Sequence, residues 1–139
     1  MMAALVPSMA LADLGNHRDH ETAFYDTISS NLLAGLYQTP FGQMLEFYDA
    51  TNHAIATTFF NASRFDANVI SILDSRNIGN NHLVEVKSNN PGARCWATAA
   101  GDLYVEVGVL ADGRSYRLYA TDAGLHEIDE LHARMKMAR

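Results

Sequence analysis

The sequence predicts an α+β domain with two layers: a mainly antiparallel sheet of about six to seven strands, covered on one face by an N-terminal and a C-terminal helix. Three observations lead to this fold class. Apolar and polar residues alternate through the stretch 102–121, and apolar residues recur with helical spacing near both ends of the chain. The 139 residues, 48% of them hydrophobic, suffice for one core. Because each predicted helix has a single apolar face, we expect both helices on the same side of the sheet.

The strongest strand signal is the stretch 102–121, in which DLYVEVGVL and SYRLYAT flank ADGR. A two-residue type I′ turn at Asp112 and Gly113 places Val107 opposite Leu118 on one face, which we expect the helices to cover. The other face then includes tyrosine and arginine, residue types enriched where proteins dock. The predicted binding residues on that face are Tyr104, Glu106, Arg117 and Tyr119.

The N-terminal half is predicted to contain one long helix followed by strands. Apolar side chains recur every fourth residue from 24 to 36, which predicts a helix over about 17–38 that ends before Pro40. Aromatic and β-branched residues predict strands over 44–49 and 55–60. Within residues 66–75, the run 69–73 fits either a strand or a short helix, and its β-branched content favours the strand. Asn and Gly residues predict a loop over 75–81.

The C-terminal part is predicted to form a four-strand meander followed by a helix. Strands are expected over 82–87 and 94–98, separated by a turn at Pro91 and Gly92, and the hairpin supplies the last two strands. The final helix runs from Asp122 to the end of the chain, with Thr121 or Asp122 as its cap. Its acidic residues come early and its basic residues late, which complements the helix dipole.

Residues 1–15 are predicted to form an apolar arm ahead of a single α+β domain that spans residues 16–139. The first twelve residues are uncharged and end in Ala10, Leu11 and Ala12, as a truncated signal peptide does. No Lys or Arg precedes this apolar stretch, so we expect an arm and a cytoplasmic protein. Export with cleavage after Ala12 is the alternative. Elsewhere no uncharged run is long enough to span a membrane.

Composition and charge exclude several classes of function. The formal net charge is −6, and the ten basic residues are scattered, so we expect no nucleic-acid partner. Cys95 is the only cysteine, which excludes an intramolecular disulfide and a zinc site built on paired thiolates. The glycines form no phosphate-binding motif and the serines form no nucleophile motif. The sequence therefore predicts no cofactor and no catalytic residue.

Two pairs of residues have the spacing of metal ligands on a helix. His17 and His20 are three residues apart, and His126 and Glu130 are four apart on the last helix. A metal or acid–base site would need the two pairs to converge. Polar residues also cap helix starts, and charged residues also cover solvated helix faces. We therefore predict no metal site and keep these residues as candidates.

The sequence favours a non-catalytic protein-binding module, such as an inhibitor, an adaptor or a chaperone-like protein. It would bind another protein, or a second copy of itself as a homodimer, through the aromatic-bearing sheet face. One alternative is a small hydrolase that uses His and carboxylate groups, with or without a divalent metal. Another alternative is an exported inhibitor or envelope protein.

Overall fold

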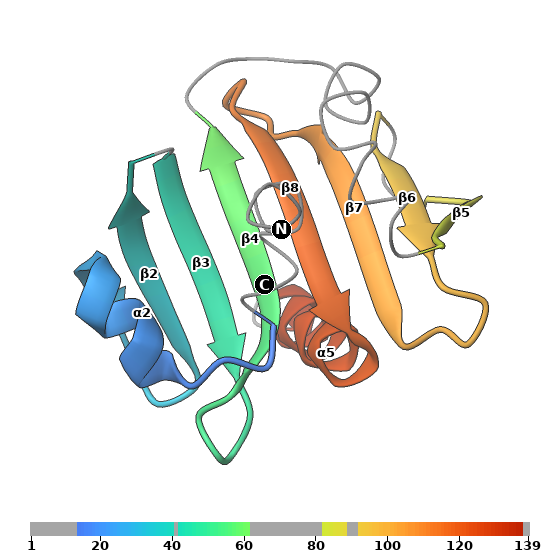
Figure 1. The fold of residues 1–139 in the computed structure, drawn as a ribbon. Coiled ribbons are helices and arrows are strands. Elements are labelled where there is room, and N and C mark those ends of the chain that lie inside the picture. Colours follow the sequence, from blue (N-terminus) through green and yellow to red (C-terminus); the bar gives the residue numbers. More distant parts are fainter. Residues whose placement is uncertain (1–13, 41, 62–81, 89–91, 138–139) are drawn as a thin grey trace, which may run out of the picture.

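The computed structural model describes residues 14–40, 42–61, 82–88 and 92–137. Within these residues the chain forms an open antiparallel sheet of eight strands in the order β1-β2-β3-β4-β8-β7-β6-β5, with two helices (Figure 1). In chain order the elements are α2 (Arg18–Phe24), β1 (Asp26–Ser30), β2 (Ala34–Thr39), β3 (Gly42–Tyr48), β4 (Ala54–Asn61), β5 (Val84–Val86), β6 (Arg94–Ala97), β7 (Leu103–Val109), β8 (Ser115–Thr121) and α5 (Asp122–Met137). The predicted α+β class with an antiparallel sheet is confirmed, and the sheet has more strands than predicted.

The sheet consists of two four-strand meanders that meet where β4 pairs with β8. One meander is β1 to β4, and the other is the predicted C-terminal meander β5 to β8, which is confirmed. The strands predicted over 44–49 and 55–60 correspond to β3 and β4. The strand predicted over 82–87 is shorter than expected, because β5 spans Val84–Val86.

The two helices lie on opposite faces of the sheet, as Figure 1 shows. We call the α2 side the front face and the α5 side the back face. Tyr25, directly after α2, packs with Tyr37 and Met44 on the front face. Leu125 of α5 packs in a cluster with Leu118 on the back face. The predicted placement of both helices on one face is therefore wrong, because the N-terminal helix is too short to cover the sheet.

The long helix predicted over 17–38 is wrong: α2 has seven residues, and β1 and β2 follow it. The cause is a turn at Asn31. The side-chain oxygen of Asn31 accepts hydrogen bonds from the backbone N–H groups of Leu33 and Ala34, at 2.9 and 2.8 Å. Such a turn gives the backbone an alternative to the helix, so the chain reverses and forms a hairpin.

The helix predicted from Asp122 onward is confirmed as α5. Thr121 caps it, because the backbone N–H of Gly124 donates to the Thr121 hydroxyl at 3.2 Å. The predictions for residues 1–13, 66–75 and 75–81 lie outside the described residues. Of the predicted arm, Leu14 packs against the core cluster of the front face.

The hairpin between β7 and β8 differs from the prediction by one residue in register. Val107 lies opposite Arg117 rather than Leu118, because the loop has three residues and Gly113 has a positive φ of 92°. The side chains of a strand alternate between faces, so this slip turns β8 over relative to β7. The valines of β7 therefore share the front face with Arg117 and Tyr119.

Candidate functional site

The four predicted binding residues do not share one exposed face, so that prediction is wrong. Tyr104 and Glu106 lie on the back face, and Arg117 and Tyr119 lie on the front face. Tyr119 is fully buried in the core cluster of the front face. The guanidinium of Arg117 lies 5.7 Å from the ring centre of Phe59. A binding role for these residues as one surface has no geometric basis.

The predicted metal-ligand candidates lie on helices that occupy opposite sides of the sheet. His17 caps α2, where its Nδ1 accepts a hydrogen bond from the backbone N–H of Asp19 at 3.1 Å. The ring of His20 packs against Phe24. On α5, His126 Nε2 lies 3.7 Å from a carboxylate oxygen of Glu130. Within the described ranges, no group of three or more His, Cys, Asp or Glu residues is arranged to hold a metal ion.

A groove lies at the end of the sheet where the β1–β2 turn, the β3–β4 turn and the start of α5 come together. It has a volume of about 620 Å³ and we call it the end groove. Its lining residues are Leu33, Tyr48, Asp49, Ala50, Ile55, Asp122, Ala123, His126 and Glu127. Three segments that are far apart in the sequence therefore form one concave surface, the usual form of a binding site.

The end groove combines apolar side chains with acidic ones. Leu33 and Ile55 supply apolar surface, and carboxylates come from Asp49, Asp122 and Glu127. The hydroxyl of Thr51 and the backbone N–H of His53 donate to Asp49 at 2.6 and 3.0 Å. These bonds hold the pKa of Asp49 below its ordinary value, the Thr51 hydroxyl having the largest effect. The groove therefore has a negative charge at neutral pH.

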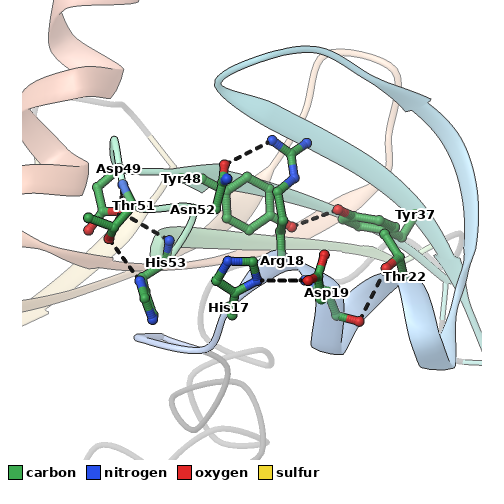
Figure 2. A network of polar contacts seen from close by, with 10 residues as sticks. All are labelled: His17, Arg18, Asp19, Thr22, Tyr37, Tyr48, Asp49, Thr51, Asn52 and His53. Carbon is green, nitrogen blue, oxygen red and sulfur yellow. Dashed lines mark hydrogen bonds and ion pairs between the residues drawn. The ribbon is translucent and has the colours of Figure 1, made fainter.

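Arg18 fixes the β1–β2 turn next to the β3–β4 turn, as Figure 2 shows in part. Its guanidinium donates to the carbonyls of Asn31 and Leu32, at 3.0 and 3.2 Å. It also donates to the side-chain oxygen of Asn52 at 3.3 Å, and it lies 4.5 Å from the ring centre of Tyr48. One arginine thus connects both turns that border the groove.

The β1–β2 turn exposes two leucines beside this groove. Leu32 is 85% exposed and Leu33 is 52% exposed, although the turn is hydrogen-bonded through Asn31 and Arg18. Phe24 and Ile28, on the adjoining part of the chain, are exposed as well. Leucines held in water by an ordered turn are already positioned for contact with a partner.

Sequence reasoning missed the exposed leucines because it placed them inside a helix. Asn31 directly before Leu32 and Leu33 was the available signal, because asparagine favours turns over helix interiors. Of the candidate residues predicted from sequence, His126 lines the end groove, and Glu130 contacts it through His126.

No protein-family model, curated protein or solved structure matches this chain. Among the described residues, neither helix is long and apolar enough to cross a membrane.

Proposed function

We propose that the chain is a protein-binding module whose end groove receives a segment of a partner protein. The segment carries an apolar side chain next to a lysine or an arginine. The observation that carries this proposal is the exposure of Leu32 and Leu33, on a turn fixed by Arg18, beside a groove that contains carboxylates.

Apolar burial supplies the affinity in this proposal. Covering a leucine side chain with a partner removes apolar surface from water and contributes roughly 1.5–3 kcal/mol when burial is complete. Leu32 and Leu33 already sit in a hydrogen-bonded turn, so binding orders few additional bonds. Ile55 extends the apolar surface into the groove.

The carboxylates of the groove supply the specificity. Asp49, Asp122 and Glu127 attract a cationic side chain and repel an acidic one. The net charge of −6 has the same sign, so it adds to this attraction at long range. Because surface charges are screened by salt, binding through this groove weakens as ionic strength rises.

Selection from a phage-displayed library of random peptides tests the proposal. We expect enrichment of peptides that carry an apolar residue next to Lys or Arg. A selected peptide should lose about tenfold or more in affinity for the variants Leu33→Ser and Glu127→Lys, because a loss of 1.4 kcal/mol corresponds to a factor of ten.

The matched control is Val84→Ser, which removes an exposed apolar side chain at the opposite edge of the sheet. Val84→Ser should bind the selected peptide as tightly as the unchanged protein. Peptides that bind Leu33→Ser and Glu127→Lys with full affinity would contradict the proposal. Self-association that Leu32→Ser abolishes would identify a second copy of the chain as the partner instead.

A further inference from the structure

A second cavity lies on the back face of the sheet, beside α5. It has a volume of about 430 Å³, within the usual range for small-molecule sites. Aromatic and aliphatic side chains from β3, β4, β8 and α5 form most of its wall, and they include Phe47, Phe60, Leu118 and Ile128. This cavity shares no lining residue with the end groove.

Glu106 is the acidic residue in the lining of this otherwise largely apolar cavity. Its carboxylate accepts hydrogen bonds from the hydroxyls of Tyr104 and Tyr116, at 2.8 and 2.5 Å. The Cys95 sulfur lies 3.5 Å from Glu106 Oε1. A carboxylate has about four lone-pair positions, so these contacts leave Glu106 able to accept a further bond.

No positive side chain neutralises Glu106 within the part of the chain that the structure describes. None of the ion pairs there includes it. Arg114 lies 5.2 Å from the ring centre of Phe60, but its guanidinium is bonded to Asp112 at 2.8 Å. Glu106 therefore places a negative charge in an apolar cavity with neutral hydroxyls as its partners, and such a charge favours a cationic ligand.

The tyrosine hydroxyls keep their protons. Burial is the main cause that raises the pKa of Tyr104, and its contacts with Cys95 and Glu106 raise it further. Tyr104 thus stays a neutral donor at physiological pH. A ligand cation at Glu106 meets no competing positive charge from this side chain.

We propose that this cavity binds a small apolar molecule that carries a protonated amine. The ammonium group pairs with Glu106, and the hydrocarbon part packs on Phe47, Phe60 and Leu118. The charge of the carboxylate selects a cation, and the apolar wall selects a hydrocarbon body over a strongly hydrated polyamine. The cavity volume limits the ligand to a drug-sized molecule or smaller.

Three probes of one shape and different charge test this proposal on the unchanged protein: 4-phenylbutylamine, 4-phenylbutanol and 4-phenylbutyrate. Amide chemical shifts in ¹H–¹⁵N NMR spectra follow each titration. We expect the amine to bind at least about tenfold more tightly than the alcohol, and the acid more weakly still. The shifts should map to Phe60, Glu106, Tyr116 and Leu118, which line the cavity.

The variant Glu106→Gln should reduce the affinity for the amine to that for the alcohol. The matched control is Glu46→Gln on the front face, where Tyr48 and Thr57 donate to a fully buried carboxylate at 3.1 and 2.7 Å. Glu46 does not line the cavity, so this variant should bind the amine as the unchanged protein does.

The proposal is overturned if the three probes bind with equal affinity. It is also overturned if the amine shifts only residues of the end groove, such as Asp122 and Glu127. If Glu106→Gln does not fold, the comparison of the three probes on the unchanged protein decides, because it needs no substitution.

Discussion

Glu46 and Glu106 have the same relation to a tyrosine but lie on opposite faces of the sheet. Tyr48, two residues after Glu46 in β3, donates to Glu46, and Tyr104, two residues before Glu106 in β7, donates to Glu106. Residues two apart in a strand point to the same face, so each pair meets without a turn. Glu46 is fully buried, whereas Glu106 lines a cavity. Only Glu106 is therefore placed to meet a ligand.

We expect Gly124→Ala to destabilise the protein, although alanine is the better helix former. A Cβ at Gly124 would lie 1.9 Å from the carbonyl oxygen of Ile55, and this backbone atom of β4 cannot move easily. In a free helix the change gains about 1 kcal/mol, whereas overpacking here should lose about 2 kcal/mol or more. The free energy of unfolding in urea measures the result.

The control for that substitution is Ala123→Gly at the neighbouring exposed position of α5. It should cost about 1 kcal/mol or less, from helix propensity alone. If Gly124→Ala instead raises the stability, α5 does not approach β4 as closely as described.

We expect Arg18→Lys to loosen the turn that carries the exposed leucines. Lysine keeps the charge but lacks the planar fork that reaches Asn31 and Leu32 together. The backbone N–H of Tyr48, which donates to the Leu33 carbonyl at 2.9 Å, should exchange with deuterium roughly tenfold faster, which corresponds to a loss of about 1.4 kcal/mol.

A matched control for Arg18→Lys is Arg94→Lys, which alters an arginine paired with Glu85 at the other edge of the sheet. It should leave the exchange of the Tyr48 amide unchanged. Equal exchange rates in Arg18→Lys and the unchanged protein would show that Arg18 does not fix the turn.

The C-terminal half of the fold was predictable because its signals are local. The strands β5 to β8 follow one another in sequence and pair with their neighbours, so alternation within each strand suffices to locate them. The start of α5 was predictable for the same reason, since Thr121 is both a recognisable cap residue and the observed cap.

The N-terminal half was not predictable from periodicity, because a spacing of four residues fits two structures. Positions 24, 28, 32 and 36 lie near one face of a helix, but four is also a multiple of the strand period of two. The hydrogen bonds that Asn31 accepts decide for the turn. Here a short polar interaction outweighs a regular apolar pattern.

The end groove could not be predicted, because its walls come from three distant segments of the chain. Leu33, Asp49 and Asp122 meet only once the two meanders pair through β4 and β8. The cavity around Glu106 depends on the register of β7 and β8, which a single loop residue decides. Local patterns carry information on neither of these long-range relations.

Below about pH 4, the stability that Asp49 contributes should be lost. The Thr51 hydroxyl and the His53 backbone N–H hold the folded-state pKa of Asp49 below its unfolded value, which is about 3.9. The contribution is therefore fully present above that unfolded value and disappears as the pH falls through the folded value. Urea unfolding at a series of pH values from neutral to strongly acidic measures it.

The variant Asp49→Asn isolates this effect, because asparagine still offers an oxygen to Thr51 and His53 but does not titrate. The carboxyls of Glu85 and Asp112 also have lowered pKa values, but they are present in both proteins and cancel in the difference. The stability difference between the two proteins should shrink as the pH falls. A difference that does not depend on pH would mean that Asp49 gains nothing from its hydrogen bonds.

Finally, Gly113→Ala should destabilise the β7–β8 hairpin more than Gly113→Asn does. Gly113 has a φ of 92°, and asparagine tolerates left-handed backbone angles better than alanine. The left-handed conformation costs an ordinary L-residue about 1–2 kcal/mol, so alanine should lose about 1 kcal/mol more than asparagine. Nuclear Overhauser contacts between the backbones of Val107 and Arg117 report the register directly. Contacts of Val107 with Leu118 in their place would restore the two-residue turn and reverse the faces of β8.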